Sequence, residues 1–179
     1  MQATAPVATI TPMTSDTFSA VFFYVDGIPT KGLWFNFDDN ELTSELVAEA
    51  LSAQYVGCSV DEVLVSDAQG FADYFHSCEC FDWDGWETFS EELAHTSLDR
   101  EVVMAYFENC GQTDLDTIEE AYAGEWASDE DFATDLLEQC GDLDQMPENL
   151  RYYFDYSAFA RDLMISDYFE NNSHYFRNM

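Results

Sequence analysis

The chain has 179 residues, of which 37 are Asp or Glu and five are Lys or Arg, so its formal net charge is -32. Five basic side chains cannot form the positive surface that binding to DNA, RNA or an anionic membrane requires, so these partners are excluded as direct ligands. Hydrophobic residues make up 47% of the chain and aromatic residues 16%. Acidic disordered tails lack such residues, and the composition therefore predicts a folded protein with a buried core.

Residues 1–17 are predicted to form a disordered leader. This segment contains Thr and Pro, and it has neither the positive start nor the apolar run of a secretory signal. No apolar stretch approaches the roughly 20 residues that cross a membrane. The five cysteines are an odd number in a chain without a signal. These features predict reduced thiols and a cytoplasmic location.

Residues 18–77 are predicted to form an N-terminal α+β domain. The apolar runs 21–25 and 33–37 are typical of two strands, and the turn-forming residues between them predict a hairpin. Apolar residues then recur at four-residue spacing between positions 42 and 50, which predicts a helix. Residues 63–65 are predicted to form a third strand, closed by turn residues.

Residues 78–118 are predicted to form a helical middle domain without strands. Apolar residues fit one helical face over positions 86–93 and another over positions 103–110. Gly111 follows the second face and has the residue type that often ends a helix.

Residues 119–179 are predicted to form a C-terminal α+β domain. A strand is expected at 121–126, and Ser128 is a suitable N-cap for the helix that follows. Two further helices are expected before residues 166–176, which are predicted to form an edge strand. The whole chain is therefore predicted to be an α+β protein of three small consecutive domains.

Motifs for catalysis or metal binding are weak in this sequence. Cys78 and Cys80 form a C-x-C pair near His76, without the second pair or the histidine spacing of a zinc site. Residues 80–91 match an EF-hand frame in part, but the first ligand position holds a cysteine, which does not suit a hard cation. No P-loop, dinucleotide-binding or nucleophile-elbow motif occurs. The sequence predicts no enzyme, no metal and no cofactor.

The acidic side chains are concentrated in residues 36–145, the part that should be folded. Glu41, Glu45 and Glu49 recur at four-residue spacing, and residues 131–138 repeat the pattern. Like charges at this spacing destabilise a helix and are usually interrupted by lysines, which are almost absent here. Because duplex DNA carries two charges per base pair, the net charge of -32 equals that of roughly 16 base pairs. The pattern indicates carboxylates that replace DNA phosphates.

The carboxylates predicted to meet the partner in this way come from all three domains. They are Asp38, Asp39, Glu41, Glu45, Glu49, Asp61, Glu62, Asp82, Asp84, Glu87, Glu91, Glu92, Asp114, Asp116, Glu119, Glu120, Glu125, Asp129, Glu130, Asp131, Asp135 and Glu138.

Several segments carry a resemblance to a known family. They are Gly32–Trp34 (GLW), Glu119–Trp126 (EEAYAGEW), Asp131–Ala133 (DFA), Pro147–Tyr156 (PENLRYYFDY) and Ala160–Leu163 (ARDL). On these segments the chain resembles the ArdA family of antirestriction proteins, with the closest similarity in the C-terminal third.

The resemblance implies a DNA mimic, encoded by mobile genetic elements, that inhibits type I restriction–modification enzymes without turnover. It implies that the protein occupies their DNA-binding groove, meets the methyltransferase core and the specificity subunit, and works in the cytoplasm of the host bacterium. It also implies an elongated chain that forms a homodimer through the C-terminal domain, where residues 136–143 align with the family's antirestriction motif. The side chains expected at or near the dimer contact are Leu136, Leu137, Leu143, Tyr152, Phe154 and Tyr156.

Two other hypotheses are compatible with the charge. One is an acidic inhibitor of another DNA-binding target, such as a CRISPR complex, a repressor or a nucleoid protein. The other is a salt-adapted acidic domain with no mimicry. A mimic should lose its partner as salt rises, whereas a salt-adapted domain should require high salt for stability.

Overall fold

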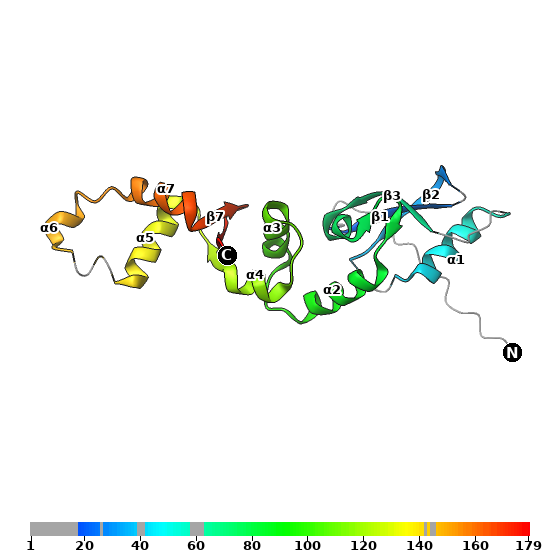
Figure 1. Ribbon diagram of the computed structural model, residues 1–179, viewed down its shortest axis with the longest axis horizontal. Helices are drawn as coiled ribbons and strands as arrows, with labels where there is room; N and C mark the ends of the chain where they lie inside the picture. The colour runs from blue at the N-terminus through cyan, green and yellow to red at the C-terminus, as the bar shows by residue number, and fades with distance from the viewer. Residues whose placement is uncertain (1–17, 26, 39–41, 58–62, 142, 144–145) are drawn as a thin grey trace. The chain divides into compact units, whose positions relative to one another are not determined.

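The computed structural model contains helices and small antiparallel sheets, and it confirms the predicted α+β class (Figure 1). The chain divides into two compact units, Met1–His95 and Thr96–Met179. The finer division into three domains stays a prediction, and the predicted leader lies outside the described residues. The structure describes residues 18–25, 27–38, 42–57, 63–141, 143 and 146–179.

The N-terminal unit is built around a three-stranded antiparallel sheet. Strand β1 (Ala20–Val25) lies in the centre, with β2 (Ile28–Asn36) on one side and β3 (Leu64–Gln69) on the other. Five of the six side chains of β1 are buried. This burial explains why β1 is a continuous apolar run without the alternation of a half-exposed strand. The predicted hairpin and third strand are confirmed, although β2 begins earlier and β3 ends later than expected.

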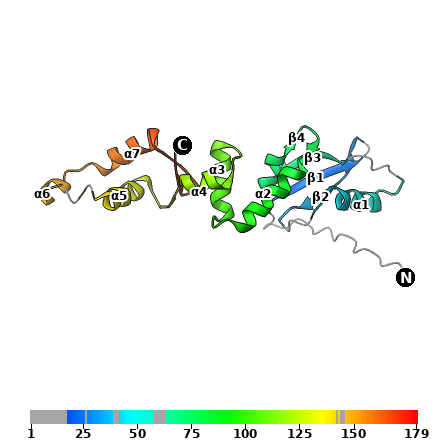
Figure 2. The same cartoon turned by 60° about the horizontal axis from the view of Figure 1, so that its bottom comes forward.

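Helix α1 (Ser44–Gln54) follows the sheet, as predicted. The hydroxyl of Thr43 accepts a hydrogen bond from the backbone N–H of Leu46 at 3.4 Å and caps the helix. Val47 and Leu51 are fully buried, and α1 packs against β1 and β2, as both views show (Figure 1, Figure 2). The acidic side chains of the helix are thereby left on its exposed face.

A short hairpin precedes helix α2 (Trp83–His95). Its strands are β4 (His76–Ser77) and β5 (Cys80–Phe81). The prediction that residues 78–118 contain no strand was therefore wrong. Strands of two residues are too short to show an alternating pattern, so periodicity could not identify them.

Aromatic packing joins α2 to the sheet of the N-terminal unit. Trp83 stacks on Phe23 of β1, with ring centroids 5.4 Å apart and an interplanar angle of 13°. Trp86 meets Phe37 edge to face at 5.2 Å and Phe75 at 5.4 Å. The first helix of the segment predicted as the middle domain thus contributes to the N-terminal core.

The C-terminal unit contains a second three-stranded antiparallel sheet, with the strand order β6-β8-β7. Helices α5 and α7 lie side by side next to it (Figure 1, Figure 2). The elements of this unit are α3 (Arg100–Cys110), α4 (Leu115–Ala121), β6 (Tyr122–Glu125), α5 (Asp129–Cys140), α6 (Glu148–Arg151), α7 (Tyr156–Ser166), β7 (Tyr168–Asn171) and β8 (His174–Arg177).

Residues 166–176 differ from their prediction as one edge strand. Strands β7 and β8 form a hairpin through Asn172 and Ser173, which both have positive φ, and β8 lies in the centre of the sheet. Neither Asn172 nor Ser173 is a glycine, so the usual sequence signal for such a turn is absent. Buried Phe132 of α5 packs between this hairpin and the helices, beside Tyr168 and Tyr175.

No helix among the described residues is long and apolar enough to cross a membrane.

Candidate functional site

The first turn of α5 concentrates acidic side chains in a fixed geometry. Asp129, Glu130 and Asp131 occupy that turn, where the positive end of the helix dipole favours negative charge. The hydroxyl of Ser128 accepts a hydrogen bond from the backbone N–H of Asp131 at 3.2 Å and donates one to its carboxylate at 2.7 Å. The predicted cap is confirmed, and it holds the carboxylate of Asp131 in place.

Two carboxylates on α4 are held by hydrogen bonds. Asp114 caps α4 by accepting from the backbone N–H of Thr117 at 2.8 Å and from its hydroxyl at 3.0 Å. Glu119 accepts from the hydroxyls of Thr96 at 2.8 Å and Ser97 at 3.2 Å. These hydrogen bonds lower the pKa of both carboxyl groups. Both side chains therefore stay negatively charged under more acidic conditions than an ordinary carboxylate.

Helices α1 and α2 carry a second group of predicted site residues. Glu45 and Glu49 lie on the exposed face of α1, and Glu87 and Glu91 lie one helical turn apart on α2, where both are exposed. The pKa of Glu45 is lowered because its carboxylate accepts hydrogen bonds from its own backbone N–H and from the neighbouring hydroxyls. This group is therefore also available as a negatively charged surface.

The predicted carboxylates are with few exceptions exposed. Asp38 and Asp135 are half-buried, and the other predicted carboxylates among the described residues are exposed. Asp38 accepts hydrogen bonds from the backbone N–H groups of Phe18 at 2.7 Å and Ser19 at 3.0 Å, so it also serves the fold. The predicted residues Asp39, Glu41, Asp61 and Glu62 lie outside the described residues.

The negative charge of this surface cannot be neutralised within the chain. Five Lys and Arg side chains face 37 carboxylates, so most carboxylates have no cationic partner in any fold of this sequence. Arg161 and Asp162, which are neighbours on the exposed side of α7, form an ion pair at 3.1 Å. The site can therefore attract an extended positive surface.

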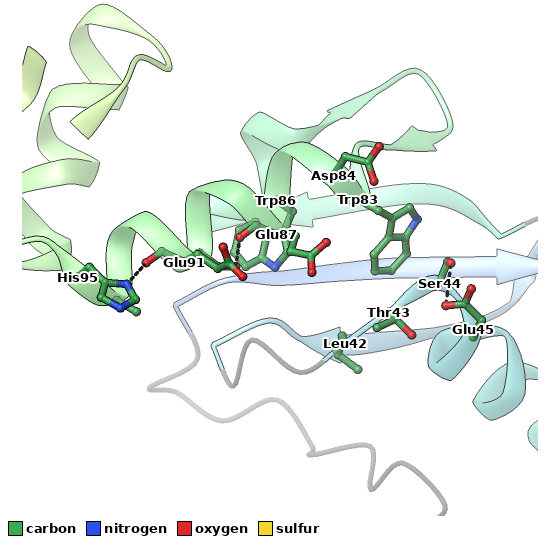
Figure 3. A pocket seen from close by; sticks show the side chains of 12 residues that line it. Leu42, Thr43, Ser44, Glu45, Trp83, Asp84, Trp86, Glu87, Glu91 and His95 are labelled. Atoms are coloured by element: carbon green, nitrogen blue, oxygen red, sulfur yellow. Dashed lines mark hydrogen bonds between the residues drawn. The ribbon is translucent and has the colours of Figure 1, made fainter. Parts of the chain in front are cut away.

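A groove lies between the start of α1 and one face of α2 (Figure 3). It encloses about 540 Å³, and both tryptophans at the start of α2 contribute to its lining. No local sequence pattern indicates this groove, because its two walls are about 40 positions apart in the chain. Its described lining residues are Leu42, Thr43, Ser44, Glu45, Trp83, Asp84, Trp86, Glu87, Ser90, Glu91, Ala94 and His95.

The residues predicted at the dimer contact have different environments. Leu137 and Leu143 are buried within the chain, and Leu136 packs against the core cluster of α5. Phe154 and Tyr156 are half-buried and meet edge to face at 4.9 Å. Tyr152 alone among the six is exposed, at 87%, within the part of the chain that the structure describes.

Besides Tyr152, three exposed apolar residues of the C-terminal unit were missing from the predicted contact. Leu150 is 49% exposed, Tyr153 is 80% exposed and Ile165 is 74% exposed. The Tyr-Tyr doublet at 152–153, in the turn that follows α6, was a usable signal, because two adjacent large side chains cannot both face the interior from one short turn.

The motifs weighed for metal binding include Asp82, Cys78 and Cys80, which the structure describes. Asp82, a carboxylate of the partial EF-hand frame, accepts a hydrogen bond from the backbone N–H of Gly85 at 3.0 Å at the start of α2. The thiols of Cys78 and Cys80 are free and exposed. Within the described residues, no group of three or more His, Cys, Asp or Glu side chains is arranged to hold a metal ion.

Comparison with known proteins identifies a family that matches most of the chain. The family described as Antirestriction protein (ArdA) matches residues 23–177, which include the groove, the exposed carboxylates and the aromatic C-terminal segment. No curated protein matches the chain significantly. Because the match covers both compact units, the chain belongs to the ArdA family of antirestriction proteins, which inhibit restriction enzymes.

Proposed function

We propose that this antirestriction protein acts as a mimic of duplex DNA and occupies the DNA-binding groove of type I restriction–modification enzymes. The observation that carries the proposal is the distribution of exposed carboxylates over helices of both units, with a net charge of -32. The partner surface would include the methyltransferase core and the specificity subunit, in the cytoplasm of the host cell. Inhibition by occupation needs no catalytic turnover.

The chemistry of the carboxylates supports this mode of inhibition. A DNA-binding groove presents Lys and Arg side chains that donate hydrogen bonds to phosphate oxygens. Carboxylate oxygens accept the same charge-assisted hydrogen bonds, and Arg binds either anion with two parallel bonds. An enzyme surface that evolved to neutralise phosphates therefore has the donors that these side chains need.

The spacing of the charges favours collective recognition. Neighbouring carboxylates such as Glu87 and Glu91 are four residues apart, which corresponds to about 6 Å along a helix. Duplex DNA carries one charge per about 1.7 Å of its axis. A single helix face is thus less densely charged than DNA, so several faces have to act together.

Rigid support of the carboxylates favours tight binding. Glu119 is held by Thr96 and Ser97, and Asp131 is held by Ser128. A side chain that is fixed before binding loses less conformational entropy when it meets its partner. Hydrogen bonds from neutral donors provide this fixation and leave the negative charge in place.

We also propose that the protein forms a homodimer through its C-terminal unit. Tyr152, Tyr153 and Ile165 present large apolar surfaces to solvent. Residues 146–179 contain three of the five basic residues and few acids, so two strongly negative chains would repel each other least there. Buried Leu137 and Leu143 support the fold of this unit, whereas the exposed tyrosines are better candidates for the contact itself.

Phage plating tests the proposed function directly. Unmodified phage is plated on a host with an active type I enzyme, with and without expression of this protein. We expect restriction to be relieved, and we expect purified protein to displace duplex DNA from the purified enzyme in competition. Unchanged restriction together with undiminished DNA binding would overturn the proposal for that enzyme.

A second measurement separates mimicry from salt adaptation. The midpoint of urea unfolding is determined at about 0.1 M and about 1 M salt, and binding to the enzyme is determined under the same conditions. Mimicry requires a folded chain at low salt and weaker binding at high salt. A chain that folds only near 1 M salt would instead be a salt-adapted domain.

A further inference from the structure

The groove between α1 and α2 combines two features that a DNA backbone does not have together. Trp83 and Trp86 line it (Figure 3), and the acidic residues Glu45, Asp84 and Glu87 are also among its lining residues. Phosphate offers negative charge but no aromatic surface. The groove therefore has a chemistry of its own within the acidic surface.

The aromatic part of the lining is held rigidly by the core. The ring of Trp83 is stacked on Phe23 at 5.4 Å and also meets Phe81 edge to face at 4.9 Å. Trp86 is 5% exposed and packs against Phe37. Because these contacts fix the indole rings before any ligand arrives, a ligand would not have to order them.

The acidic part of the lining lacks a compensating cation. None of the described lining residues is Lys or Arg, and the ring of His95 is engaged at the end of α2, where its Nδ1 lies 2.7 Å from the carbonyl oxygen of Glu91. An aromatic surface bordered by uncompensated carboxylates attracts organic cations. The positive charge that fits this groove must therefore come from outside the chain.

The arrangement of the carboxylates indicates the shape of that cation. No cluster of the described carboxylates converges closely enough to hold a metal ion. The acidic residues of the lining come from two helices and are spread along the groove (Figure 3). A flat, wide cation can contact an indole ring and a carboxylate at the same time, whereas a small metal ion cannot.

We propose that this groove binds the guanidinium group of an arginine side chain of the restriction enzyme. Guanidinium is planar, is weakly hydrated, stacks on indole rings and forms paired hydrogen bonds with carboxylates. Ammonium is a compact and strongly hydrated point charge, so lysine fits less well. The inference rests on the proposed function, because it gives one arginine of the DNA-binding groove a specific acceptor on the mimic.

A matched pair of double variants tests the groove. Glu45→Gln with Glu87→Gln removes two charges from the lining, and Glu49→Gln with Glu92→Gln removes two charges from the same helices outside it. All four side chains are exposed, so both variants should fold. We expect the first to weaken inhibition about tenfold, and the second by no more than about threefold. Equal losses would overturn the inference.

A peptide titration tests the same groove without the restriction enzyme. The full chain is titrated with acetyl-Gly-Arg-Gly-amide at about 0.2 M salt, and the same peptide with Lys or citrulline in place of Arg is the control. We expect the indole N–H resonances of Trp83 and Trp86 to shift with the Arg peptide most strongly, while Trp34 and Trp126 stay unchanged. Uniform shifts of all four, or equal shifts with the Lys peptide, would contradict guanidinium recognition.

The two experiments distinguish failure of the groove from failure of the proposed function. If the wild-type chain inhibits no type I enzyme, the proposed function fails, and the groove loses its assigned partner even if the peptide binds. If the wild-type chain inhibits but the two double variants behave alike, mimicry stands and the groove inference fails. Both the proposed function and the groove inference are supported if two results are found. Glu45→Gln with Glu87→Gln must weaken inhibition more than the control pair does, and the indole resonances of Trp83 and Trp86 must shift most with the Arg peptide.

Discussion

The phenolic hydroxyl of Tyr175 donates a hydrogen bond to the carboxylate of Asp129, with 2.8 Å between the two oxygen atoms. Tyr175 lies on the central strand β8 and is 2% exposed, and Asp129 lies in the first turn of α5. The contact therefore joins the core of the C-terminal unit to its acidic helix. Burial first and this hydrogen bond second raise the pKa of Tyr175 well above its usual range.

Replacement of Tyr175 by Phe should lower the free energy of unfolding by about 1 kcal/mol near pH 7, because one hydrogen bond to a charged acceptor is lost. Because the pKa of Tyr175 is higher in the folded state than in the unfolded state, the hydroxyl stabilises the fold fully below the unfolded-state pKa of about 10. This stabilisation is lost as pH rises further toward the folded-state pKa. The difference between wild type and variant should therefore shrink above about pH 10. Urea unfolding at pH 8 and pH 10.5 measures both effects, and a constant difference would contradict this assignment.

Two glycines with similar backbone angles should tolerate alanine very differently. Gly70 and Gly141 have φ of +66° and +71°, so a side chain costs conformational energy at both. At Gly70 an added Cβ would lie 1.7 Å from the carbonyl oxygen of Phe18, whereas at Gly141 it would meet nothing within 4 Å. We expect Gly141→Ala to lower the free energy of unfolding by about 1 kcal/mol and Gly70→Ala to lower it by at least roughly 2–3 kcal/mol. Urea unfolding measures both values. Similar costs would mean that the backbone at Gly70 can move away.

Removal of the Asp114 cap should destabilise the protein in a pH-dependent way. The pKa of Asp114 is lowered, first by the hydrogen bond from the backbone N–H of Thr117. A carboxylate whose pKa is lower in the folded state stabilises the protein above its unfolded-state pKa of about 4. This stabilisation is lost as pH falls through the folded-state pKa. Asp114→Ala should therefore be less stable than wild type at pH 7, with a difference that diminishes toward pH 2.

The variant Asp114→Asn is the matched control, because Asn retains the capping geometry without a titratable group. It should remain closer to wild type than the Ala variant at pH 7. Thermal unfolding followed by circular dichroism compares the three proteins. An Asn variant as unstable as the Ala variant would show that charge, and not capping, dominates at Asp114.

Loss of one exposed carboxylate should have little effect on inhibition. Asp116→Asn removes one charge from the surface of α4 and is expected to change the inhibition constant less than about twofold, because many weak contacts share the binding energy. The logarithm of the inhibition constant should rise linearly and steeply with the logarithm of salt concentration. Abolished inhibition by a folded Asp116→Asn variant, or binding insensitive to salt, would exclude distributed mimicry.

Replacement of Tyr152 and Tyr153 by Ser should convert a dimer to a monomer of 20.4 kDa. Both side chains are at least 80% exposed, so their removal should leave the core intact. The control is Ile28→Ser, an exposed apolar position of the N-terminal unit. Sedimentation velocity reports the mass of each variant. A double variant that sediments as wild type would exclude these tyrosines from the contact.

Much of the local structure could be predicted because it depends on neighbouring residues. The cap formed by Ser128, the helical face of α1 and the apolar run of β1 depend on spacings of a few positions, which are visible in the sequence. Very short strands and atypical turns carry no such signal in the sequence. The turn at Asn172 and Ser173 lacks glycine, and strands β4 and β5 are too short to show a period.

The charge of the protein was determined by the sequence alone. No fold can pair 37 carboxylates with five basic side chains, so a strongly negative surface follows from composition and excludes nucleic acid as a direct ligand. The chain segments that carry the family resemblance were also visible without any structure. Composition does not depend on how distant segments meet.

The tertiary structure decided which side chains share a surface. It buried Leu137 and Leu143 and left Tyr152 exposed, and it brought Glu45 and Glu87 to the two sides of one groove with Trp83. These outcomes depend on packing between helices that are distant in the sequence. The physical reason is that burial and proximity arise from contacts across the core, which no periodic pattern within one helix contains.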